Sequence, residues 1–185
     1  MSTRPLEQAV ASTRAVLAAV APDQLDAGTP CADWKVSDLI NHIVGGQWFF
    51  ASGVTGTPPA GGEADFSAGD YVAAFDEASQ ACLDAFNGEG VMDKVLSLPF
   101  GEMPGRAFVG LAATDTFTHG WDLAKATGQD TNLAPELAAE ILEQSRQSIQ
   151  PAFRSEAGNP FGFEQPAPQG ACAADQLAAF LGRTV

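Results

Sequence analysis

The stretch Ala107–Gly128, AFVGLAATDTFTHGWDLAKATG, constrains the fold more than any other part of the chain. Apolar side chains recur in it every three or four residues, and Gly128 stands where a helix would end. Asp115 and His119 are four residues apart, which places both side chains on one face of a helix, about 6 Å apart along its axis. Asp122 follows one turn later, so a mostly apolar stripe ends in three polar groups. Because an isolated buried charge is costly, we expect these groups to be paired or bound to a metal.

Length and charge limit the classes of protein to which the chain can belong. Its 185 residues suit a single domain with its own hydrophobic core, which we place at residues 1–185. The net charge is −14 with only nine Lys and Arg, so neither a nucleic acid nor an anionic membrane is an expected partner. No apolar run approaches the roughly 20 residues of a membrane span, and MSTRPLEQAV lacks the apolar core of a signal peptide.

The cysteines indicate the redox environment. Cys31, Cys82 and Cys172 are odd in number and widely spaced, so they predict neither a disulfide framework nor a cysteine-based zinc knuckle. A reducing cytoplasm is the simplest location for such a chain. The sequence leaves the oligomeric state open, a homodimer included.

Hydrophobic periodicity predicts a mainly α-helical bundle. The expected helices are Pro5–Ala21, Val36–Ser52, Ser67–Asn87, Ala107–Gly128 and Asn132–Ile149, with a short terminal helix at Ala173–Leu181. Asn132 is the expected cap of the fifth helix, and the Gly/Pro-rich stretch Gly53–Phe66 is expected to be an exposed connection. Val91–Phe100 alternates and predicts a short strand or extended segment, followed by a turn at Gly101–Gly105. Long helices with short connections favour a four-helix bundle in antiparallel or crossover order.

The chain contains only two histidines, His42 and His119, and each lies on an expected long helix beside an apolar face. Together with Asp115 they would form a three-ligand site with two nitrogens and one oxygen in the bundle core. This set matches catalytic zinc, whose fourth position holds water or substrate, and it also fits iron, nickel or manganese. The alternative is a pair of core histidines, one of them hydrogen-bonded to Asp115 across a helical turn.

The sequence allows more than one role for two further residues near this set, Asp122 and Cys31. Asp122 has three possible roles: a fourth metal ligand, a carboxylate that orients a ligating imidazole through a hydrogen bond to its other ring nitrogen, or a surface partner of Lys125. We favour the second role. Cys31 precedes the second helix, whose N-terminus would stabilise a thiolate. Its other interpretation is a small buried apolar residue.

Glycines and tryptophans are candidates for the walls of a pocket. Gly45 and Gly46 follow His42 by about one turn, and glycines there lower helix stability by roughly 1 kcal/mol each. Close approach of another helix, or room beside His42, would explain them. Trp34, Trp48 and Trp121 are expected in the core or in the pocket wall rather than in a catalytic role.

Three segments carry a resemblance to a known family. They are Thr29–Trp34 leading to Asp38–His42, then Leu98–Gly105, then Asp115–Ala124. Their order and spacing resemble the DinB-like superfamily. Within it they are similar to the N-terminal-domain group of mycothiol-dependent maleylpyruvate isomerases, whose small members are often described only as metal-binding proteins. The terminal Leu177-x-x-Phe180-Leu181-Gly182-Arg183 also fits that group.

The resemblance implies a DinB-like four-helix bundle with a short extended segment before the fourth long helix and a short C-terminal helix. It implies one divalent metal, usually zinc or nickel, held here by His42, Asp115 and His119. Asp115 stands where many relatives have Glu or His, so the metal is expected closer to its helix. Lys35 stands where Ser or Thr often caps the second helix, which predicts a looser helix start.

The resemblance also implies a chemistry, because the characterised enzymes use the metal to activate a thiol such as mycothiol or bacillithiol. The first expected function is therefore a metal-dependent S-transferase or isomerase that joins a mycothiol-like thiol to a small electrophile. The alternatives are a non-catalytic metal or small-molecule binding protein and a metal-dependent hydrolase. The chain ends before the larger C-terminal domain of the isomerase, so maleylpyruvate itself is not an expected substrate.

Overall fold

The structure is a computed structural model that describes residues 2–31, 33–59, 64–156 and 161–185. Its α-helices are α1 (Arg4–Ala18), α2 (Val36–Thr55), α3 (Tyr71–Phe86), α4 (Gly105–Ala126), α5 (Pro135–Ser148) and α6 (Ala173–Phe180). The strands are β1 (Val95–Leu98) and β2 (Gly101–Pro104). Short 3-10 turns occur at Pro22–Gln24, Phe66–Ala68, Val91–Asp93 and Pro151–Phe153. The prediction of a mainly α-helical fold is confirmed.

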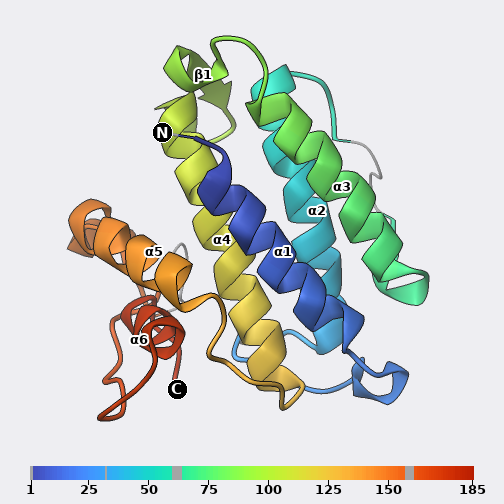
Figure 1. Cartoon of the computed structure of the whole chain (residues 1–185), viewed down its shortest axis with the longest axis vertical. Coiled ribbons are helices and arrows are strands. Elements are labelled where there is room, and N and C mark those ends of the chain that lie inside the picture. The colour runs from blue at the N-terminus through green and yellow to red at the C-terminus, as the bar shows by residue number, and fades with distance from the viewer. Residues whose placement is uncertain (1, 32, 60–63, 157–160) are drawn as a thin grey trace.

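The long helices α1 to α4 lie side by side as a bundle, with α1 packed on α4 and α2 packed on α3 (Figure 1). Leu17, Ile40, Phe75 and Leu123, one from each helix, are fully buried in a shared apolar cluster. Burial of each such side chain stabilises the fold by about 1.5–3 kcal/mol. α5 and α6 pack on each other beside α4, outside the bundle. Within the described ranges, no helix has the length and apolar character needed to cross a membrane.

α2 runs farther than the sequence predicted. The connection was expected to begin at Gly53, but the helix continues to Thr55 and ends at Gly56, whose φ is +72°. Gly53 serves close packing instead, because a Cβ there would lie 2.7 Å from the ring of Phe108 on α4. Residues 60–63 of the expected connection lie outside the described residues.

The segment before α4 is a hairpin in which β1 and β2 pair antiparallel, with Leu98 opposite Gly101. The predicted alternation is confirmed, since Leu96 and Leu98 are buried and their neighbours in β1 are exposed. The prediction of a turn at Gly101–Gly105 is wrong. The turn lies at residues 99–100, and Gly101 begins the second strand with φ of +127°, a conformation that favours glycine.

α5 begins at Pro135, later than predicted, and Pro135 occupies the first turn. Asn132 is not its cap. The residue before the helix is Ala134, with φ of +32°, while the backbone N–H of Asn132 donates to Asp130 Oδ1 at 2.9 Å. Asn132 therefore belongs to a separate turn. The other helix ends differ from the predicted ones by only a few residues.

The contact between α1 and α4 provides a test of the packing. A Cβ at Gly120 of α4 would overlap Thr13 Oγ1, which donates to the backbone oxygen of Thr116 at 2.9 Å. We expect Gly120→Ala to lower the free energy of unfolding by about 1–3 kcal/mol. Gly110→Ala is the matched control on the same helix, because a Cβ there meets open space; it should raise stability by about 0.5–1 kcal/mol. Urea unfolding measures both, and equal stability of the two variants would contradict this packing.

Candidate metal site

Three side chains from α2 and α4 converge between these helices. His42 projects from α2, and Asp115 and His119 project from successive turns of α4. The start of α2 is closed by Asp38, whose carboxylate accepts a hydrogen bond from the backbone N–H of Lys35 at 2.9 Å. The looser helix start expected from Lys35 is therefore not seen, and the helix that carries His42 begins in an ordered turn.

The donor atoms of these side chains are separated by distances that suit ligands of one metal ion. Asp115 Oδ1 lies 3.6 Å from His119 Nε2 and 3.9 Å from His42 Nε2. The donor atoms of the group all lie within 4.8 Å of one another. Two ligands bound at about 2.1 Å in a tetrahedral zinc site would be about 3.4 Å apart. The group therefore fits a zinc-sized ion after a small contraction.

Neither imidazole forms a hydrogen bond with Asp115, because both distances exceed the usual limit. The interpretation of a core histidine bonded to Asp115 across a turn thus lacks its hydrogen bond. Within the described part of the chain, His42 Nε2 is buried without a hydrogen-bond partner. Such an atom costs about 1–3 kcal/mol. A cation between His42 and Asp115 would provide the missing partner.

His119 is oriented from behind by Asp122, since His119 Nδ1 lies 3.0 Å from Asp122 Oδ2. Burial favours the neutral acid, but the hydrogen bond from His119 and the charge of Arg183 outweigh it and lower the pKa of Asp122 to about 2. An ionised carboxylate only accepts hydrogen bonds, so Nδ1 of His119 is the donor. The neutral ring then has its lone pair on Nε2, which faces Asp115, as a metal ligand requires.

The Asp122 carboxylate receives hydrogen bonds from three parts of the chain. Arg183 binds both oxygens, with Nη2 2.9 Å from Oδ2 and Nε 3.2 Å from Oδ1. The thiol of Cys31 donates to Oδ2 at 3.2 Å. Asp122 is fully buried and points inward, so it does not form the surface pair with Lys125. Cys31 is half-buried and is more than a small apolar residue, because its Sγ joins this hydrogen-bond cluster.

Without a metal, the surroundings of His119 favour a second proton on its imidazole. Burial lowers the pKa of this imidazole, but the charge of Asp115 and the hydrogen bonds to Asp122 and Cys31 outweigh burial and raise the pKa of His119 from 6.5 to about 10. The raised pKa means that the imidazolium stabilises the metal-free fold fully below pH 6.5, and that this contribution is lost as the pH rises through about 10. A metal ion at Nε2 would displace this proton.

A pocket of about 400 Å³ lies beside His42 and Asp115. It is lined by His42, Gly45, Gly46, Phe49, Phe50, Leu111 and Asp115. A Cβ at Gly46 would lie 3.5 Å from Asp115 Oδ2, and a Cβ at Gly45 would meet open space. These glycines therefore leave room beside His42 and Asp115, which was one of the two roles considered, instead of serving close helix packing.

Trp48 and Trp121 lie in the core, one of the two places expected for them, and not in the described lining of the pocket. Trp121 is 1% exposed and donates from Nε1 to Asp175 at 2.9 Å, because a residue two positions after His119 faces the opposite side of the helix. Trp48 packs against the core cluster of the bundle. Trp34 flanks the site instead, with its ring centroid 4.8 Å from that of His42 and 6.0 Å from that of His119.

Arg183 is the main part of the site that sequence reasoning missed. It follows Asp122 by 61 residues, so no helical spacing connects the two. The only signal was its place in the terminal motif that resembles the family.

Cys31, His119 and Asp122 form a second group of donor atoms that are close enough for one metal ion. Arg183 already supplies a positive charge to Asp122, and Nδ1 of His119 already donates to it. A cation there would have to displace both interactions. The group of His42, Asp115 and His119 is therefore the better cation site.

Comparisons with known proteins identify a family model, two sequence relatives and a solved structure that are similar to this chain. Residues 6–124 match the family model described as mycothiol maleylpyruvate isomerase N-terminal domain. The chain is 47% identical over 176 residues to uncharacterized proteins of two Mycobacterium tuberculosis strains, CDC 1551 and H37Rv, covering 92% of this chain and 91% of each relative.

The crystal structure of the mycothiol-dependent maleylpyruvate isomerase has a similar fold, with a TM-score of 0.56 and 16% identity. The match covers 80% of this chain and 71% of that chain. His42, Asp115 and His119 lie within residues 6–124, whereas Arg183 lies beyond them. The chain therefore belongs to the mycothiol maleylpyruvate isomerase N-terminal domain family.

Proposed function

We propose that this chain is a divalent-metal enzyme that activates a small thiol of the mycothiol class and joins it to a small electrophile. The observation that carries the proposal is the convergence of His42, Asp115 and His119, the first two of which line an open pocket. Structural zinc sites are closed by four protein ligands, whereas three ligands beside an open pocket are typical of catalytic sites. The thiol is supported by the family, whose model and solved relative are both named for mycothiol.

Zinc is the ion we favour, with nickel second, because two imidazoles and one carboxylate suit either ion. When bound, such an ion lowers the pKa of a coordinated thiol, so that the thiolate nucleophile forms near neutral pH. Cys31, Cys82 and Cys172 are all free thiols, which supports our placing the protein in the reducing cytoplasm.

The chain's own residues would orient the site and keep it dry. Asp122 holds the His119 ring so that Nε2 faces Asp115, and Arg183 holds Asp122 in turn. Phe49 and Leu111 line the pocket beside the donor atoms. Apolar walls of this kind exclude water, so a nucleophile beside them is less hydrated and water competes less with it for the electrophilic carbon.

The reaction balances without a redox partner. The thiol gives its proton to solvent, and its sulfur forms a bond to the electrophilic carbon while the leaving group departs with the bonding electron pair. With an alkene conjugated to a carbonyl, the sulfur bonds to the far alkene carbon while the π electrons move to the carbonyl oxygen as an enolate. The former double bond can then rotate, and return of the electrons breaks the carbon–sulfur bond. The thiolate regains its proton from solvent, so the thiol is recovered and the alkene is isomerised. The same site thus serves a transferase or an isomerase.

Maleylpyruvate is a poor match to this pocket. That molecule carries two carboxylates, and an anionic substrate needs cationic partners. Among the described residues that line the pocket there is no Lys or Arg, so the bound metal would be the one cation available to two carboxylates. We therefore propose an uncharged electrophile as the substrate.

The ligand assignment predicts metal content. We expect purified protein to hold about one divalent ion per chain, and His42→Ala, Asp115→Ala and His119→Ala to lose most of it after dialysis, because each removes one of three ligands. Asp93→Ala is the matched control, since that carboxylate is 90% exposed and lies outside the site. Metal analysis by plasma mass spectrometry measures the content, and full occupancy in both histidine variants would rule out this site.

The role of Asp122 predicts a smaller effect. Asp122→Asn keeps the shape of the side chain but removes the charge that orients His119, so we expect metal affinity to fall 10–100-fold, about 1.4–2.7 kcal/mol. Asp175→Asn is the control on the other side of α4, because Asp175 accepts a hydrogen bond from Trp121 and lies outside the candidate metal groups of the described residues. Competition with a chromophoric chelator gives the affinities. Wild-type affinity in Asp122→Asn would show that this carboxylate does not orient the ligand.

Thiol binding predicts a spectroscopic signal. Titration of mycothiol into the cobalt-substituted protein should produce a sulfur-to-metal charge-transfer band, which S-methyl mycothiol should not produce. Cys31→Ser should retain the band, because the sulfur comes from the added thiol. If saturating mycothiol gives no band while cobalt stays bound, thiol activation is wrong. A band that disappears in Cys31→Ser would assign the sulfur to the protein instead.

A further inference from the structure

A second hollow, of about 450 Å³, lies between α4 and α5. Its lining includes Ala107, Leu111 and Thr114 of α4, and Ile149, Phe153 and Phe161 beyond α5. We call it the α4–α5 groove. Its volume lies within the roughly 300–1,000 Å³ of small-molecule sites, and its mixture of apolar walls with a few polar groups is typical of them.

The groove adjoins the candidate metal site. Leu111 lines both the groove and the pocket that contains His42 and Asp115. Leu111 and Asp115 are one turn apart on α4, about 6 Å along the helix axis. A molecule whose reactive carbon lies beside the metal ligands could therefore extend over Leu111 into the groove.

The chemistry of the lining selects an uncharged, apolar occupant. Phe153 is 48% exposed, so a ligand in the groove would bury aromatic surface that the chain leaves in water. Arg106 is the one charged residue among the described lining residues, and its guanidinium lies 3.7 Å from the carboxylate of Asp93. Its charge therefore has a partner without a ligand.

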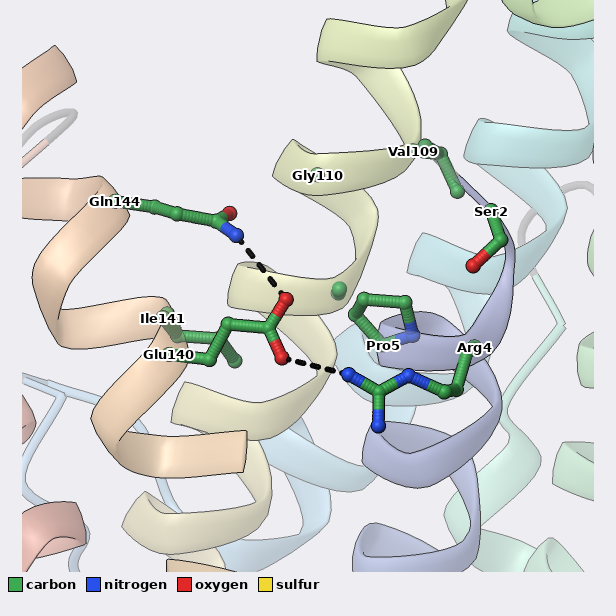
Figure 2. A pocket seen from close by; sticks show the side chains of 9 residues that line it. Ser2, Arg4, Pro5, Val109, Gly110, Glu140, Ile141 and Gln144 are labelled. Carbon is green, nitrogen blue, oxygen red and sulfur yellow. Dashed lines mark hydrogen bonds and ion pairs between the residues drawn. The ribbon is translucent and has the colours of Figure 1, made fainter. Parts of the chain in front are cut away.

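The smaller pocket in Figure 2 is not an alternative to the α4–α5 groove as a ligand site beside the candidate metal site. It has a volume of about 140 Å³ and is lined by residues from the N-terminal segment, α1, α4 and α5. Glu140 accepts hydrogen bonds there from Arg4 at 3.1 Å and from Gln144 at 3.3 Å, so these polar groups are paired with one another. None of its described lining residues belongs to the candidate metal site.

We propose that the α4–α5 groove binds the hydrophobic body of the electrophile, an uncharged aryl or medium-chain alkyl compound, while its reactive carbon lies at the metal site. This inference rests on the proposed function for the reaction, but the groove as a ligand site can be tested separately. The bond changes are those given above, with a carbon–sulfur bond formed and the leaving group released.

The binding test uses the neutral fluorescent probe N-phenyl-1-naphthylamine. Ala107→Phe and Ser148→Phe place a ring in the groove from opposite walls, and both positions are exposed, so the fold should tolerate them. Ala139→Phe is the matched control, because Ala139 is exposed on α5 and is not part of the groove. We expect the groove variants to weaken probe binding about tenfold or more, about 1.4 kcal/mol. Absence of probe binding in the wild type, or equal affinity in all variants, would overturn the proposal.

The kinetic test compares two electrophiles with mycothiol, the aryl compound 1-chloro-2,4-dinitrobenzene and the small compound iodoacetamide. The kcat/KM for the aryl compound, divided by that for iodoacetamide, should be about tenfold lower in Ala107→Phe than in Ala139→Phe, which corresponds to about 1.4 kcal/mol. An equal ratio in the two variants would contradict a substrate role for the groove. If neither electrophile reacts while the probe is still lost from the groove variants, the proposed function is wrong and the groove stands as a ligand site.

Discussion

The buried carboxylate of Asp122 is the interaction on which the site depends. An isolated ion in the interior costs several kcal/mol, and Asp122 avoids that cost by accepting hydrogen bonds from His119, Arg183 and Cys31. These partners lie on α4, in the segment after α6 and in the loop before α2. The same carboxylate therefore orients a candidate metal ligand and attaches the C-terminal segment to the bundle.

The C-terminal segment is held in place for this role by contacts of its own. Arg154 donates from Nη1 to the backbone oxygens of Gly162 and Phe180, each at 2.7 Å. Gly182 has φ of +101°, and a Cβ there would lie 2.5 Å from the Cα of Gly162, so only glycine allows the two backbones to approach. This close approach is what brings Arg183 to Asp122. Metal affinity and the packing of α6 are thus expected to be coupled.

Local pattern explains what the sequence could and could not predict. The helices follow from the spacing of apolar residues, and the proximity of Asp115 to His119 follows from their separation of four residues on one helix. Asp115 and His119 lie near His42 only because α2 packs beside α4. The predicted four-helix bundle allowed for this packing. The contact of Arg183 with Asp122 was not predictable, because a contact between residues far apart in the sequence leaves no periodic signal. Trp121 was expected in the core or in the pocket wall, and it lies in the core because a residue two positions from His119 faces the opposite side of the helix.

The surroundings of the donor set are the basis for proposing a catalytic site rather than a site that only stores a metal. Nε2 of His42 is buried without a hydrogen-bond partner among the described residues, and a pocket lined by Gly45 and Gly46 leaves its neighbourhood open. A cation would complete the ligand group, and the pocket would give an external thiol access to it. In our proposal, the α4–α5 groove, which shares Leu111 with this pocket, would hold the apolar body of the substrate.

X-ray absorption at the zinc edge of the purified, thiol-free protein tests the central claim most directly, because it reports the atoms bound to the metal. We expect nitrogen and oxygen neighbours at about 2.0–2.1 Å, outer-shell scattering from two imidazoles, and no sulfur at about 2.3 Å. Addition of mycothiol should introduce one sulfur neighbour. A sulfur neighbour before mycothiol is added would place the metal at Cys31, His119 and Asp122 and contradict the account.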